Sequence, residues 1–138
     1  MTRNVYVDVL NKSSIDDDDD ITLVTQLTSS RSEKLYSLVL RWPGPISVSV
    51  YVEHSIAIAS LKEEMKTKLS KRNNIALHLV GEAGPFFPVN FLRNVALEHA
   101  KTKYIFLSDV DFEPMPRLEG YLKRYISEGY LQGKTVGS

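Results

Sequence analysis

Two aspartates in the last third of the chain have the side chains and the spacing to bind a divalent metal ion. Asp109 and Asp111 are separated by one residue and follow the apolar run 104–107. Two carboxylates at the point where a strand emerges can converge on one divalent cation, and oxygen ligands of this kind suit Mg²⁺ or Mn²⁺. Such ions keep open positions for phosphate oxygens. The alternative is a polar turn that closes the strand, with Asp111 capping the next segment.

Three polar side chains on a predicted helix add groups that bind anions. Asn90, Arg93 and Asn94 are three and four residues apart, so they share one face of a helix predicted from Pro88 to about Lys101. Amide donors and a guanidinium near a helix start suit a phosphate or a sugar. A solvated helix surface is the alternative.

The end of the first predicted strand, 21–27, offers further polar groups. Thr25, Gln26 and Thr28 present hydroxyl and amide groups where a nucleoside base would lie, or they take part in ordinary turn chemistry. The three histidines lie in unrelated contexts, and none is spaced from another as a metal ligand. His78 alternates with apolar neighbours and is predicted to be a strand residue.

The elements that position these groups alternate between strands and helices. Strands are predicted at 21–27, 46–52, 75–80 and 104–107, and helices start at a Ser30–Glu33 capping box, near Ser55, at Pro88 and near Pro116. The result is an α/β chain with a mostly parallel sheet, helices on both faces and right-handed crossovers. Ligands of such sheets bind beyond the carboxyl ends of the strands, near the switch in strand order. The run 104–107 is expected to be covered on both faces.

Apolar stripes and charges complete the prediction for the helices. The second helix buries a stripe of Ile58, Leu61, Met65 and Leu69. The last helix is expected to place Leu118, Tyr121, Leu122, Tyr125 and Ile126 on one side. A small basic patch of Lys66, Lys68, Lys71 and Arg72 is diluted by Glu63 and Glu64.

Length and composition limit the function classes. The chain has 138 residues, 43% of them hydrophobic, which fits one globular domain. Lys plus Arg and Asp plus Glu are 17 each, so a strongly basic protein that binds nucleic acid or a membrane surface is excluded. The lack of cysteine excludes disulfides, zinc–thiolate sites and thiol catalysis. No targeting or transmembrane segment is predicted. Residues 1–20, with the acidic run 16–20, are expected to be a disordered lead-in, and 132–138 a frayed tail.

Four segments in the same order resemble glycosyltransferase family 49, which holds the glucuronyltransferase domain of LARGE-type enzymes and a β-1,4-glucuronyltransferase acting on dystroglycan O-mannose glycans. The segments are 20–27, 41–47, 87–96 and 104–112. The resemblance covers about Asp20 to Ile126 and is far more specific than the D-x-D triplet alone.

The resemblance implies a GT-A fold, a UDP-sugar donor (UDP-glucuronate, with N-acetylglucosamine or xylose as the alternative sugars), a glycan acceptor on a glycoprotein, and Mn²⁺ or Mg²⁺ held by Asp109 and Asp111. It also implies inverting transfer, and a place in the Golgi lumen as part of a type II membrane protein. The candidate donor-binding residues are Thr25, Gln26, Arg31, Asn90, Arg93, Asn94, Ser108, Asp109 and Val110.

Only 27 residues follow Asp111, so we expect residues 21–131 to be the donor-binding half of the GT-A domain, truncated after the D-x-D motif. We therefore assign no catalytic base, and we expect the chain alone to bind UDP and Mn²⁺ weakly and to transfer little or no sugar. Two alternatives stay open: a non-catalytic α/β module that binds a nucleotide or a partner, and a phosphatase of haloacid-dehalogenase type, which also uses a D-x-D at a strand end.

Overall fold

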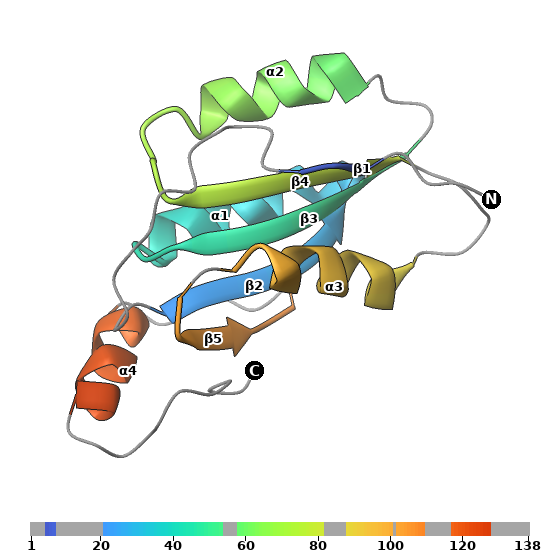
Figure 1. Cartoon of the computed structure of the whole chain (residues 1–138). Coiled ribbons are helices and arrows are strands. Elements are labelled where there is room, and N and C mark those ends of the chain that lie inside the picture. The colour runs from blue at the N-terminus through green and yellow to red at the C-terminus, as the bar shows by residue number, and fades with distance from the viewer. Residues whose placement is uncertain are drawn as a thin grey trace.

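A five-stranded sheet forms the centre of the molecule. The computed structural model describes residues 5–7, 21–53, 58–81, 88–100, 102–109 and 117–127. The strands are β1 (Val5–Tyr6), β2 (Ile21–Thr28), β3 (Ile46–Val52), β4 (Ile75–Gly81) and β5 (Tyr104–Leu107), in the order β1-β4-β3-β2-β5 (Figure 1). Strands β2, β3, β4 and β5 pair in parallel, and β1 pairs with β4 antiparallel. The predicted α/β fold with a mostly parallel sheet is confirmed.

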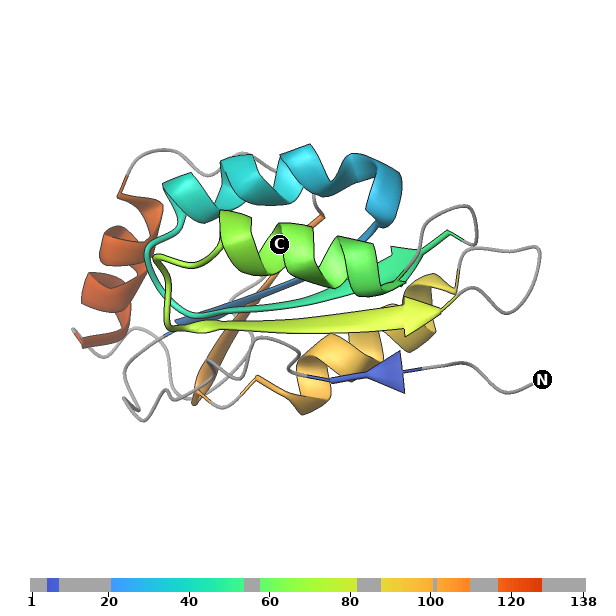
Figure 2. The same cartoon turned by 90° about the horizontal axis from the view of Figure 1, so that it is seen from above.

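Helices cover both faces of this sheet. They are the short 3-10 helix η1 (Ser29–Arg31), α1 (Ser32–Arg41), α2 (Ile58–Lys68), α3 (Val89–Glu98) and α4 (Leu118–Ser127). Helices α1 and α2 lie on one face and α3 on the other (Figure 2). The chain steps from β2 to β3 to β4 in one direction and then returns past them to β5. Because crossovers keep one hand, this reversal places α3 on the opposite face from α1 and α2.

The reversal also defines the switch point of the sheet. Strand β2 has β3 on one side and β5 on the other, so the direction in which the chain adds strands reverses at β2. A crevice suited to a ligand is expected at this point in open α/β sheets.

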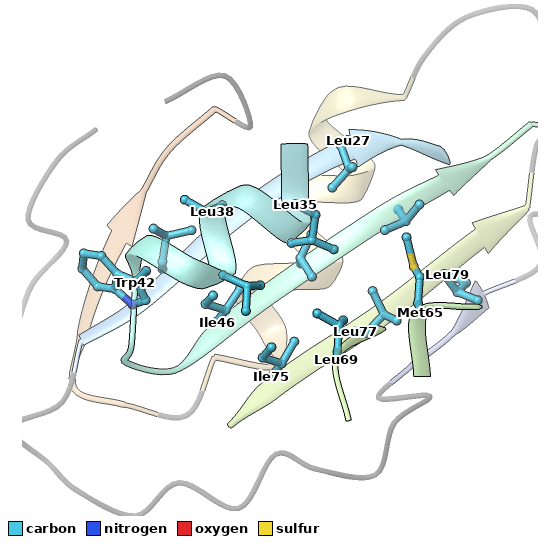
Figure 3. Packing of buried hydrophobic residues seen from close by; sticks show 14 of the residues in the cluster. Leu27, Leu35, Leu38, Trp42, Ile46, Met65, Leu69, Ile75, Leu77 and Leu79 are labelled. Atoms are coloured by element: carbon cyan, nitrogen blue, oxygen red, sulfur yellow. The ribbon is translucent and has the colours of Figure 1, made fainter. Parts of the chain in front are cut away.

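The main hydrophobic core fills the space between the sheet and helices α1 and α2 (Figure 3). Alternate residues of β3, from Ile46 to Val52, contribute to it as predicted. Trp42, which is fully buried, follows α1; its ring stacks on Phe106 with centroids 5.7 Å apart, and its Nε1 donates a hydrogen bond to the Pro45 carbonyl at 3.2 Å. These contacts tie the turn after α1 to strand β5.

The strand that precedes the aspartate motif differs from the prediction. Strand β5 lies at an edge of the sheet and is fully covered on one face only, because Tyr104 and Phe106 are buried whereas Ile105 and Leu107 are half-buried. The run is apolar enough for a central strand, but α3 packs over β2 and β3 rather than over β5.

Two other expectations are corrected. The lead-in at 1–20, expected to be disordered, contributes β1, whose Val5 and Tyr6 pair with Val80 and Leu79; the acidic run 16–20 lies outside the described residues, as does the tail 132–138. Helix α4 packs Leu118 and Leu122 against the core but leaves Tyr121 and Tyr125 about half exposed. Its apolar stripe is therefore narrower than predicted.

The helix bounds also differ in detail. Helix α3 ends at Glu98, three residues before the predicted end, and Pro88 is its N-cap rather than a residue of its first turn. The predicted start of α2 near Ser55 falls on residues that the structure does not describe. The capping box is wrong: Ser30 lies within η1, and neither Thr28 nor Arg31, the two N-cap residues, makes a side-chain capping bond.

Helices α1 and α2 are also joined by a polar contact. The Tyr36 hydroxyl donates a hydrogen bond to Glu64 Oε2 at 3.2 Å, and the Lys68 ammonium lies 5.7 Å from the centre of the Tyr36 ring. Burial, together with the nearby Glu64 carboxylate, raises the pKa of Tyr36 to about 12, because both disfavour the phenolate.

This shift predicts a loss of stability in alkali. The neutral phenol is favoured in the folded chain, so its contribution is complete below the ordinary tyrosine pKa of 10.0 and is lost as the pH rises to about 12. Allowing for solvent screening of the exposed carboxylate, we expect Tyr36→Phe to remove about 1 kcal/mol of pH dependence in this range. Urea unfolding across the range measures it, with Tyr121→Phe as the control. An unchanged slope in Tyr36→Phe would contradict the assignment.

Candidate functional site

The candidate site lies at the carboxyl end of β5. Asp109 is exposed two residues beyond the last residue of this strand. The Ser108 amide donates a hydrogen bond to the Val24 carbonyl at 3.0 Å, which continues the β2–β5 pairing by one residue. Ser108 itself is buried, and its hydroxyl donates to the Asp109 carbonyl at 3.2 Å. Asp109 thus emerges at the switch point, anchored through its neighbour to β2.

Gln26 is the polar residue of β2 that lies nearest in register to this aspartate. Val24 of β2 pairs with Leu107 of β5. Gln26 lies two residues after Val24, and Asp109 lies two residues after Leu107. The two residues therefore occupy adjacent positions on the β2–β5 edge. The Gln26 side chain lies on the α3 face of the sheet and is 7% exposed. The two side chains therefore bring a largely buried amide and an exposed carboxylate to neighbouring positions of this edge.

Thr25, a predicted donor-binding residue, is buried within strand β2. Strand β2 continues to Thr28, so Thr25 lies within the strand rather than at its exit. Strand alternation turns its side chain toward the α1 face with Leu23 and Leu27, and it is fully buried. Within the described part of the chain its hydroxyl has no hydrogen-bond partner.

Helix α3 presents its predicted polar face to solvent. Asn90 and Asn94 are exposed and Arg93 is half-buried, whereas Leu92 and Ala96 are buried against the sheet. The helix follows β4 at the carboxyl edge and packs over β2 and β3, so its first turns start from the same edge as Asp109 (Figure 1). The structure agrees with a shared helix face for the three polar residues.

Only one of the two aspartates predicted to bind a metal ion lies within the described residues. Asp111 and Val110 lie outside the described residues. Within those that are described, no group of three or more His, Cys, Asp or Glu side chains could hold a metal. The exposed Asp109 carboxylate is a hard oxygen donor, so a Mg²⁺- or Mn²⁺-type ion that keeps positions for phosphate oxygens and water fits this chemistry better than a zinc-type cage.

A buried serine–histidine pair lies under α3 and cannot act as a catalytic dyad. The Ser47 hydroxyl donates to the Ala96 carbonyl at 2.6 Å and lies 3.2 Å from His78 Nε2, and both residues are buried. His78 is a residue of β4, as predicted, but it is not isolated, because its ring lies 4.6 Å from that of His99. No substrate reaches a hydroxyl that is sealed beneath a helix. The network fixes α3 on the sheet.

The turn after β2 carries another polar cluster, which sequence analysis missed. The Glu53 carboxylate accepts hydrogen bonds from the Ser30 amide at 3.2 Å and from the Ser29 hydroxyl at 3.4 Å. Arg31, a predicted donor-binding residue, is exposed in this turn. The available signal in the sequence was a single carboxylate directly after the alternating strand 46–52, which gives no indication of its partner.

The described surface also has a hollow that is unrelated to this edge. A cavity of about 430 Å³ is lined by Pro43 and by Arg117, Glu119, Gly120, Tyr121 and Arg124 of the α4 region. Pro43 precedes β3, so the cavity lies at the amino edge of the sheet, opposite Asp109. None of the predicted site residues lines this cavity.

Comparison with known proteins places the chain in a family. The family model described as "Glycosyl-transferase for dystroglycan" matches residues 20–86 and 59–136. The chain belongs to this glycosyltransferase family. The resemblance found in the sequence is thereby confirmed, and the observed mixed sheet with its helices is consistent with an α/β glycosyltransferase-like fold. Family membership also argues against the haloacid-dehalogenase alternative.

Curated relatives in this family are much longer than the chain. It is 41% identical over 111 residues to the human xylosyl- and glucuronyltransferase LARGE1. This aligned region makes up 80% of the chain and 15% of LARGE1. The chain is 44% identical over 116 residues to mouse LARGE2, covering 83% and 17%, and 43% identical over 115 residues to zebrafish LARGE2s, covering 83% and 15%. None of the described helices has the length and apolar character needed to cross a bilayer.

Proposed function

We propose that this chain forms the donor-nucleotide-binding part of a metal-dependent glycosyltransferase. The observation that carries the proposal is the place of Asp109, which is exposed at the carboxyl end of β5, at the switch point and next in register to Gln26. Ligands of open α/β sheets bind at this point. Relatives named xylosyl- and glucuronyltransferases supply the reaction class.

The proposed roles follow from the chemistry of each side chain. Asp109 and Asp111 would hold Mn²⁺ or Mg²⁺, which when bound neutralises charge that develops on the departing diphosphate. Arg93, with Asn90 and Asn94, donates hydrogen bonds toward the diphosphate and sugar. Gln26 is proposed for the edge of uracil, because an amide offers both a donor and an acceptor.

The wider reaction is proposed from the family. The donor is a UDP-sugar, with glucuronate as the sugar proposed first and xylose as the other named by the relatives. The acceptor is a glycan hydroxyl on a glycoprotein, in O-mannosyl glycan synthesis, and the anomeric centre is inverted by direct displacement. The whole protein is proposed to act in the Golgi lumen as a type II membrane protein.

Calorimetric titration of the 138-residue chain with UDP, with and without Mn²⁺, tests the nucleotide site. We expect Mn²⁺ to tighten UDP binding by about tenfold or more, which corresponds to about 1.4 kcal/mol. The reason is that the positive charge of Mn²⁺, once the carboxylates hold the ion, attracts the negatively charged diphosphate. This attraction is missing when Mn²⁺ is left out. UDP binding that is absent, or the same with and without Mn²⁺, would contradict the proposal and favour the non-catalytic module.

A further inference from the structure

A reciprocal set of hydrogen bonds joins the ends of two neighbouring strands. The Glu53 carboxylate accepts from the Ser30 amide and the Ser29 hydroxyl, and the Glu53 amide in turn donates to the Ser29 hydroxyl oxygen at 3.2 Å. Glu53 directly follows β3, whereas Ser29 and Ser30 open η1 directly after β2. The residues are more than twenty positions apart in the chain, so this contact is purely tertiary.

The contact replaces the local cap that this helix start lacks. The first amides of a helix have no partner within the helix and are commonly satisfied by a side chain at the N-cap. Neither of the N-cap residues at this start, Thr28 and Arg31, makes such a bond. Glu53 supplies the acceptor from the neighbouring strand, and its negative charge suits the positive end of the helix.

Burial indicates that the contact holds the turn in one place. Ser29 is 4% exposed, and Glu53 is half-buried beside it. Because Glu53 occupies the Ser30 amide, this helix start is not free to bind a diphosphate. A phosphate next to this turn would instead meet the side chains that the turn presents, and the cationic side chain of Arg31 is exposed there.

We propose that Glu53 is a positioning residue for nucleotide binding, which holds the β2–η1 turn so that Arg31 faces the carboxyl edge. This inference rests on the proposed function, because it assigns Glu53 to the same nucleotide site. Glu53 acts through Ser29 and Ser30 and does not itself touch the nucleotide. Its acceptor oxygen matters more than its charge, so glutamine at this position keeps most of the effect.

The test compares three variants of the 138-residue chain by UDP titration in the presence of Mn²⁺. Glu53→Ala is expected to weaken UDP binding by about tenfold, as removal of an outer-shell partner commonly does. Glu53→Gln, whose amide oxygen still accepts from the Ser30 amide, is expected to stay within about twofold of the wild type. The control is Glu63→Ala, which removes an exposed carboxylate from α2.

Amide hydrogen exchange provides a readout that does not depend on the nucleotide. The Ser30 amide is expected to exchange faster in Glu53→Ala and at the wild-type rate in Glu53→Gln, whereas amides of β3 and β4 stay protected in both, which also shows that the variants fold. Failure of the wild type to bind UDP would overturn the proposed function together with this inference. Wild-type binding with an unchanged Glu53→Ala affinity, or no rescue by Glu53→Gln, would overturn the inference alone.

Discussion

Replacing Asp109 with alanine is expected to abolish the gain in UDP affinity that Mn²⁺ provides, a loss of about tenfold or more. Asp109 is the described carboxylate at the switch point, and it would help to hold the metal ion whose positive charge favours diphosphate binding. Asp109→Asn is expected to lose almost as much of the gain in UDP affinity, because an amide keeps the shape of the side chain but lacks the charge that attracts a divalent ion. Titration of each variant with UDP, with and without Mn²⁺, measures the effect.

The same substitutions are expected to leave the fold intact. Asp109 is exposed beyond the end of β5, so the free energy of unfolding should change by no more than about 0.5 kcal/mol. The matched control is Glu98→Ala, which removes an exposed carboxylate from the last residue of α3. If Asp109→Ala retained the full Mn²⁺-dependent gain, the metal would have to bind elsewhere and the assignment of the site would be wrong.

Replacing Arg72 with alanine is expected to destabilise the chain by about 3 kcal/mol. Its guanidinium donates hydrogen bonds to the carbonyls of Val39 at 2.8 Å, Pro43 at 3.1 Å and Gly44 at 2.7 Å. Its Nε donates to Asn74 Oδ1 at 2.9 Å. Burial lowers the pKa of Arg72 and the Glu119 carboxylate opposes this, but a guanidinium stays charged at neutral pH.

The cause of this large effect is that Arg72 holds the turn between α1 and β3. That turn approaches α4 closely: a Cβ on Gly44 would lie 2.9 Å from Glu119 Oε2. Without the guanidinium, the carbonyls of Val39 and Gly44 lose this donor, and the Pro43 carbonyl keeps only its bond from the Asn74 side-chain amide at 3.1 Å. Thermal unfolding should show a melting temperature about 10 °C lower. Lys71→Ala, next to it and exposed, should change stability by less than about 0.5 kcal/mol, and equal effects of the two variants would contradict this role.

Arg72 also shows what a local pattern cannot reveal. In the sequence it belongs to a basic patch with Lys66, Lys68 and Lys71, and the three lysines are indeed exposed. Arg72 instead turns toward carbonyls that are about thirty residues earlier in the chain. Nothing in the spacing of like charges distinguishes a solvated cation from one that closes a distant turn.

The elements themselves could be predicted because their signals are local. Alternation at 46–52 marks β3, helical spacing of Leu61, Met65 and Leu69 marks the buried side of α2, and Pro43 and Pro45 stop α1. Each of these patterns reports which side of one element is apolar, and such a side must be buried in any fold that forms. The order of strands and helices then follows directly, and with it the α/β class.

The sequence by itself determined the alternation of elements, the place of Asp109 after an apolar strand, and the family. The strand order, the burial and the hydrogen bonds of the folded chain show that β5 is an edge strand next to β2, that Thr25 and Gln26 are both buried on opposite faces of β2, and that Glu53 caps the turn bearing Arg31. The physical reason is that periodicity encodes burial within an element, whereas strand order, register and polar partners depend on contacts between residues far apart in the chain.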